Sequence, residues 1–148
     1  MIESLIEHLR QHAKLEDSVD VERFDATLSQ IAGLNDPRAI GLLVPFFNDS
    51  CRFREAMFSI VHTIEAFDDE TYVREILKVL PDLWSRSPYW ATVLHFGVLN
   101  SQTTRLAYRT QLANADVATK AACRELLASI QQKRPQLAPQ CSELLAVL

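Results

Sequence analysis

The sequence predicts an all-α protein, folded as a right-handed α-solenoid of antiparallel helix pairs with about 8–9 helices. Two observations carry this prediction: apolar residues recur at helical spacing along the chain, and a pattern of two amphipathic helices repeats at intervals of 33 residues. Glycine is also scarce, with 3 residues in 148, and runs that alternate apolar and polar residues are missing. The composition therefore argues against a sheet.

Residues 36–67 contain the clearest copy of the repeated pattern. Asp36 is placed to cap a first helix, and Pro37 falls in its first turn, where a missing N–H costs nothing. This helix is expected to run to Phe47, before the polar turn at 48–50. A second helix follows, whose apolar stripe is Phe53, Met57, Ile60, Val61 and Ile64.

A shift of 33 residues carries this pattern into residues 69–100 and then into residues 101–131. Equivalent positions are Ile40, Val73 and Leu106 in the first helices, Met57, Trp90 and Cys123 in the second helices, and 48–49, 81–82 and 114–116 in the turns. Stacked helix pairs that have Asp and Pro near the start of the first helix resemble the HEAT and armadillo class of solenoid.

The two ends are expected to close this stack. Residues 1–34 form a capping helix pair, with a first helix over 2–14 and a second that ends near Gly33, a plausible residue to follow a helix. Residues 135–148 form a short C-terminal capping helix after the stop at Lys133-Arg134-Pro135. We therefore expect one domain over residues 1–148, with three repeats between its caps.

Charge is unevenly distributed along the chain, whose net charge is −4. Residues 65–82 hold 6 acidic and 2 basic side chains, whereas residues 101–148 hold 3 acidic and 6 basic ones. A protein that reads nucleic acid would normally show a basic stripe, so direct binding to DNA or RNA is disfavoured. A basic protein partner fits the acidic segments better.

Composition also bears on location and chemistry. No stretch approaches the ~20 apolar residues of a membrane span, and the opening MIESLIEHLR is acidic and amphipathic, unlike a signal peptide. We expect a cytoplasmic protein without a membrane partner. The three cysteines are widely spaced and include no CxxC motif, which is typical of reduced, buried thiols.

Metal binding and catalysis have weak candidates. His62, Glu65 and His95 could in principle supply three zinc ligands, but no convincing further partner accompanies them. His8 and His12 share a helix face, although Leu9 stands where a metalloprotease helix would carry Glu. Phosphate loops and nucleophile motifs are missing from the sequence. We expect no cofactor, no metal and no enzymatic activity.

A binding surface is predicted on the second helices, which line the concave side of such solenoids. Opposite the apolar stripe of residues 54–65 lie Phe58, His62 and Glu65, and the 33-residue shift adds His95 to the same row. An aromatic residue is out of place on a solvated face. The alternative is that these are ordinary exposed residues or residues covered by a neighbouring segment.

Residues 65–70 contain four carboxylates, Glu65, Asp68, Asp69 and Glu70, and two apolar residues, Ala66 and Phe67. Asp68 or Asp69 can cap a helix that begins at Thr71, and Glu70 favours the positive end of that helix. One cap needs only one carboxylate, so the surplus suggests a patch that meets cations of a partner. Trp84 is expected in the next connection, either packed or protruding as an interface anchor.

Several segments resemble a known family. They include His62, Ile64 and Glu65, the run Phe67 to Val73, Leu94-His95, and Leu99-Asn100-Ser101. Over roughly residues 34–130, the chain resembles the HEAT-like immunity proteins of bacterial polymorphic-toxin and contact-dependent growth inhibition systems, in particular the family immunity protein thirty. The resemblance implies a cytoplasmic antitoxin that binds the C-terminal domain of a cognate toxin, often a nuclease, as a monomer in a 1:1 complex.

Nuclease toxins are generally basic because they grip phosphate, so an acidic face would speed association and block the toxin sterically, without chemistry by the antitoxin. The expected contact residues are Phe58, His62, Glu65, Asp68, Asp69, Glu70, Trp84 and His95. The main alternative is a generic solenoid scaffold or adaptor that recognises a peptide or helix in its concave groove. A nucleic-acid enzyme of the same class would need a basic concave wall, which these residues do not supply.

Overall fold

The computed structural model describes residues 1–148, and it contains nine α-helices, two 3-10 helices and no strands. The predicted all-α class and helix number are confirmed. In chain order the elements are α1 (Ile2–Gln11), α2 (Ser18–Leu34), α3 (Arg38–Leu43), η1 (Val44–Phe46), α4 (Arg54–Glu65), α5 (Asp69–Arg86), α6 (Pro88–Leu99), α7 (Gln102–Leu112), α8 (Val117–Lys133), η2 (Pro135–Leu137) and α9 (Ala138–Leu145).

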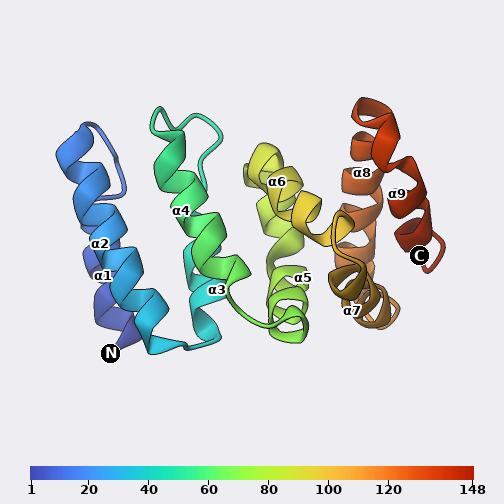
Figure 1. The fold of residues 1–148 in the computed structure, drawn as a ribbon, viewed down its shortest axis with the longest axis horizontal. Helices are drawn as coiled ribbons and strands as arrows, with labels where there is room; N and C mark the ends of the chain where they lie inside the picture. Colours follow the sequence, from blue (N-terminus) through green and yellow to red (C-terminus); the bar gives the residue numbers. More distant parts are fainter. The chain divides into compact units, whose positions relative to one another are not determined.

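The chain divides into two compact units, Met1–Asp68 and Asp69–Leu148. In Figure 1 the first unit is coloured blue to green and the second yellow-green to red. No helix in either unit is long and apolar enough to cross a membrane. The arrangement of all the helices as one solenoid domain stays a prediction.

In the first unit, α1 and α2 lie side by side and run in opposite directions, as do α3 and α4 (Figure 1). Asp17 caps α2 by accepting the Asp20 N–H at 2.9 Å. The helix α2 ends at Leu34, near Gly33 as expected, but the left-handed residue that follows it is Asn35, with a φ of 50°, and not Gly33. Asparagine tolerates this conformation better than most residues.

The third helix is shorter than predicted. Its start agrees with the sequence, since Asp36 Oδ1 accepts the Arg38 N–H at 3.0 Å. Regular α-helix ends at Leu43, and the chain continues as the 3-10 turn η1, which contains Pro45. A proline interrupts the helical hydrogen bonds, and this explains why the helix does not reach Phe47.

The predicted turn at Pro81-Asp82 is wrong, because α5 runs without interruption to Arg86. Proline has no N–H to donate to the Leu77 carbonyl four residues earlier. The Thr119 hydroxyl of α8 donates to that carbonyl instead, at 3.4 Å, and all three groups lie in the second unit. A side chain from another helix therefore supplies the hydrogen bond that proline removes from α5.

The repeat pattern locates the core of the second helices better than that of the first. Met57, Trp90 and Cys123 are all buried, as the 33-residue shift predicts. Ile40 and Val73 are buried too, but Leu106 is 63% exposed, and α7 buries Tyr108 and Leu112. The predicted turn at 114–116 is confirmed, with Asp116 as the cap of α8.

Candidate functional site

The outer face of α4 carries three of the predicted contact residues. Phe58, His62 and Glu65 are exposed, whereas Ile60, Val61 and Ile64 between them are buried. Spacing of three or four residues keeps the exposed residues on one side of the helix. Phe58 is 39% exposed, which places part of an aromatic ring at the surface beside an imidazole and a carboxylate.

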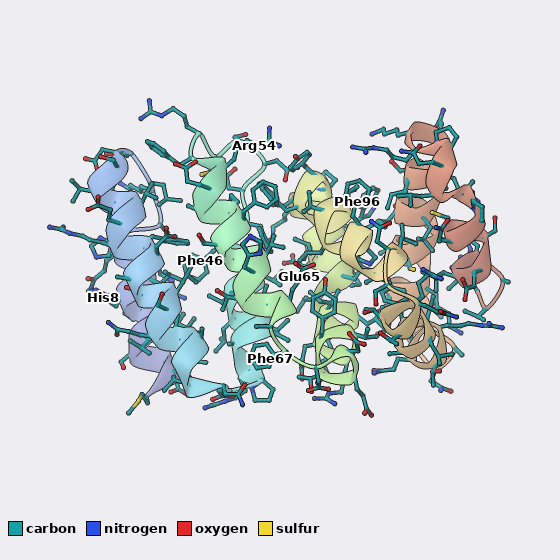
Figure 2. All side chains as sticks on the ribbon, in the orientation of Figure 1. His8, Phe46, Arg54, Glu65, Phe67 and Phe96 are labelled. Atoms are coloured by element: carbon teal, nitrogen blue, oxygen red, sulfur yellow. The ribbon has the colours of Figure 1, made fainter.

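Glu65 lies in the last turn of α4, and Phe67 lies in the connection that follows (Figure 2). The pKa of Glu65 is raised because surrounding protein atoms partly desolvate its carboxyl group, while the nearby His62 opposes the shift. The residue is nevertheless exposed. A carboxylate that is accessible and already partly desolvated loses less hydration when a cation approaches it.

The remaining carboxylates of the run have different environments. Asp68 is exposed in the connection. Asp69 begins α5 and is half-buried, and its Oδ1 accepts the Thr104 hydroxyl of α7 at 2.8 Å. Glu70 is exposed and also lies in the first turn of α5, where negative charge stabilises the helix. Asp69 thus holds two helices together, and Glu70 offers its carboxylate to solvent.

Trp84 lies in the last turn of α5 rather than in a connection, because the helix continues past Pro81. Its indole Nε1–H donates to Glu125 Oε2 of α8 at 2.9 Å, and the side chain is half-buried. This bond fixes the ring against α8 and leaves part of it at the surface. The role of Trp84 as an interface anchor stays a prediction.

The predicted exposure of His95 is wrong, because this residue is 0% exposed. Its Nδ1 lies 2.7 Å from the Ala91 carbonyl oxygen, and its Nε2 lies 2.7 Å from the Tyr108 hydroxyl. The Tyr108 hydroxyl is also 3.3 Å from the Cys123 sulfur. Both ring nitrogens are therefore engaged in the core of the second unit, and His95 presents no atom to a partner.

Burial determines the protonation of this cluster. Desolvation lowers the pKa of His95 to about 4, although the hydrogen bond to Ala91 opposes the shift. Desolvation also raises the pKa of Cys123 to about 11 and raises that of Tyr108. All three groups are consequently neutral at pH 7. In that state His95 donates through Nδ1 and accepts the Tyr108 O–H at Nε2.

The error at His95 has a physical reason in the composition of α6. Residues 88–99 read PYWATVLHFGVL, and apolar side chains surround the whole helix. Such a sequence does not indicate which side faces the core. The half-buried residues of α6 are Thr92, Val93, Phe96 and Gly97, whereas the predicted His95 is buried.

The structure adds surface residues that sequence reasoning missed. Phe96 of α6, labelled in Figure 2, is half-buried. The Arg134 guanidinium lies 5.0 Å from the centre of its ring. Glu125, the partner of Trp84, is also exposed. The residues of each pair are about 40 positions apart in sequence, so no local pattern could have revealed them. Groups of three or more His, Cys, Asp or Glu side chains arranged to hold a metal ion are not found.

Comparison with known families identifies the class of protein. The family described as Immunity protein 30 matches residues 11–108, which include all the exposed residues of the predicted contact surface. Searches of curated proteins and of solved structures gave no significant match. The class is therefore that of immunity proteins, which implies binding to a cognate toxin. The chain belongs to the Immunity protein 30 family.

Proposed function

We propose that this chain is a bacterial cytoplasmic immunity protein that neutralises the C-terminal domain of a cognate toxin, a basic nuclease of a contact-dependent growth inhibition or related system. The match to the Immunity protein 30 family over residues 11–108 carries the proposal. The antitoxin acts by tight, stoichiometric binding that blocks the toxin sterically. It performs no chemistry of its own.

The proposed contact residues are Phe58, His62, Glu65, Asp68, Asp69, Glu70 and Trp84, and His95 is left out because it is buried. Exposed carboxylates at Glu65, Asp68 and Glu70 supply charge that complements a basic toxin. The exposed part of Phe58 supplies apolar area of the kind that anchors interfaces. Asp69 contributes by holding α5 against α7 and by its charge.

We further propose that the helix pairs stack as a HEAT-like right-handed α-solenoid in one domain over residues 1–148, and that the chain binds its toxin as a monomer. Helix pairs in the first unit run antiparallel, as such stacking requires. Small-angle scattering of the free chain tests the solenoid, and light scattering of the complex tests the 1:1 ratio. A generic peptide-binding adaptor would share the fold, but family membership favours the immunity role.

The decisive experiment combines the chain with the basic toxin domain encoded next to it in the source genome. We expect the two to co-purify, the toxin's nuclease activity to fall in proportion to added chain, and growth of a bacterial host that produces the toxin to be restored. Failure of the two purified proteins to associate would overturn the proposal.

A triple substitution Glu65→Lys, Asp68→Lys and Glu70→Lys tests the surface. It reverses three exposed charges, and we expect binding to weaken at least about 100-fold through lost attraction and new repulsion. Glu22→Lys is the control: it reverses one charge at an exposed position of α2 that is not among the proposed contact residues. It should leave affinity within about twofold. Unchanged affinity of a folded triple variant would move the interface elsewhere.

A further inference from the structure

The first unit has a polar cavity whose lining includes none of the proposed contact residues. It measures about 390 Å³ and lies between the α1–α2 connection and the connection from η1 to α4. Both connections lie at the same end of this unit, the upper end in Figure 1. The lining residues are Ala13, Lys14, Leu15, Glu16, Phe46, Asn48, Ser50, Cys51, Arg52 and Met57.

We propose that this cavity binds a carboxylate side chain of the partner protein, with Arg52 and Lys14 as its cationic ligands. The proposal rests on the proposed immunity function and adds to it a second, oppositely charged point of contact. It concerns a set of residues separate from the carboxylates of α4 and α5.

Arg52 is held in a defined position. One guanidinium nitrogen donates to the Glu16 carbonyl oxygen at 2.6 Å, and the guanidinium carbon lies 4.9 Å from the centre of the Phe53 ring. The group forms no ion pair with a carboxylate, so its other N–H donors remain for a ligand. A guanidinium that is already fixed loses little side-chain conformational entropy when it binds the two oxygens of a carboxylate.

The neighbouring connection is also constrained. Leu15 adopts a φ of 50° although it is not glycine, and its side chain is only 4% exposed. A bulky residue keeps this unfavourable backbone conformation only where surrounding contacts require it. Burial of Leu15 fixes the backbone between Lys14 and Glu16, and therefore fixes the carbonyl that holds Arg52.

The charge of the cavity favours a single carboxylate over a phosphate chain. Lys14 and Arg52 contribute two positive charges and Glu16 one negative charge. The first unit as a whole holds 12 acidic and 6 basic residues, so a polyanion such as nucleic acid would be repelled around the cavity. One carboxylate on an otherwise basic protein matches both the local charge and its acidic surroundings.

A titration of the free ¹⁵N-labelled chain tests the cavity without the toxin. The probe is N-acetyl-glutamate amide, and its neutral counterpart N-acetyl-glutamine amide serves as control. We expect the glutamate probe to produce saturable shifts at the backbone amides of Lys14, Leu15 and Ser50 and at the Arg52 Nε–H. The glutamine probe should leave these signals in place, because it lacks the negative charge.

Two substitutions with the same change of charge localise the effect. Arg52→Gln should weaken the probe's affinity at least about tenfold, because charge-assisted hydrogen bonds are lost. Arg23→Gln removes an exposed cation of α2 outside this cavity and should have no effect. Backbone spectra of both variants show whether each remains folded.

Shifts that are linear in probe concentration, that spread over the unit, or that survive Arg52→Gln in a folded variant would overturn the proposal. Inorganic phosphate is a further arm: equal shifts at a lower concentration would assign the cavity to phosphate instead of a carboxylate. Toxin binding is measured separately, so a negative titration leaves the immunity function standing. Conversely, saturable shifts would persist if the toxin failed to bind.

Discussion

His95 shows how a single polar residue is accommodated in the core. A buried imidazole without partners would cost several kilocalories per mole, but here both nitrogens have partners. The Tyr108 hydroxyl connects His95 to Cys123, so three residues of three helices share one chain of hydrogen bonds. The cluster requires neutral His95, and it therefore links stability to pH.

Stability should fall below pH 6.5 because of His95. Its pKa is about 4 in the folded chain against an ordinary value of 6.5, so the unfolded chain binds a proton in this range that the folded chain does not. The contribution is fully present above pH 6.5 and is lost as the pH falls toward 4. Between pH 7.5 and 5 the loss is about 2 kcal/mol.

Urea denaturation at several pH values measures this effect. His95→Gln keeps a donor and an acceptor but does not titrate. We expect it to remove most of the loss of stability between pH 7.5 and 5, whatever the substitution itself costs in stability at pH 7.5. His62→Gln changes an exposed histidine of α4 and should leave the loss close to that of the unaltered chain. Equal pH dependence in His95→Gln and the unaltered chain would contradict the prediction.

Sequence reasoning at the residue scale succeeded where amphipathic contrast was strong. In α4, polar and apolar residues alternate with helical spacing, and Phe58, His62 and Glu65 lie at the surface as expected. In α6 this contrast is missing, and the 33-residue shift therefore places His95 on the wrong side. Its partner Tyr108 comes from the next helix, and no rule of spacing within one helix predicts that contact.

Some helix boundaries are set by residues that are neighbours in sequence, and others by residues far away in sequence. Caps made by neighbouring residues, such as Asp17 and Asp116, follow from local sequence. The continuation of α5 past Pro81 does not, because it is supported by Thr119, which lies 38 positions away. A local turn signal was thus overridden by a tertiary contact, and this moved Trp84 from a connection into a helix.

The bond between Thr119 and Leu77 gives a test at the scale of the element. Thr119→Val preserves shape and branching but leaves the Leu77 carbonyl without its donor, which should cost about 1 kcal/mol of folding free energy. In a Pro81→Ala background, the new N–H at residue 81 can donate to Leu77, so the same substitution should cost less than half as much.

Urea unfolding of the four chains of this double-mutant cycle measures the coupling. Thr110→Val is a suitable control, because the exposed Thr110 hydroxyl bonds only to the Leu106 carbonyl of its own helix. It should show no coupling with Pro81→Ala. An equal cost of Thr119→Val in both backgrounds would show that the hydroxyl does not replace the missing helical bond.

At the scale of the whole molecule, charge differs between the two units. The first unit holds 12 acidic and 6 basic residues, and the second holds 7 acidic and 9 basic ones. The net charge of −4 hides this difference. A count of charges gives it directly once the boundary after Asp68 is known, because the count needs no knowledge of packing. Local geometry such as the constrained Arg52 is decided by contacts between distant residues and could not be counted in this way.

If carboxylates steer a basic toxin, salt should act on the association rate. Long-range attraction is screened as the Debye length shrinks from about 14 Å at 50 mM to about 4 Å at 500 mM salt. We expect the association rate constant to fall at least about tenfold over this range, while the dissociation rate constant changes by less than about threefold. Surface plasmon resonance or stopped-flow fluorescence with the cognate toxin measures both.

The same measurement separates steering from contact. In the triple variant Glu65→Lys, Asp68→Lys and Glu70→Lys, three negative charges become positive, so added salt should no longer slow association and should instead relieve repulsion. Glu22→Lys should keep a salt dependence close to that of the unaltered chain, because it reverses only one exposed charge and lies outside the proposed contact residues. An association rate that is insensitive to salt in the unaltered chain would mean that the carboxylates act only after the two proteins have met.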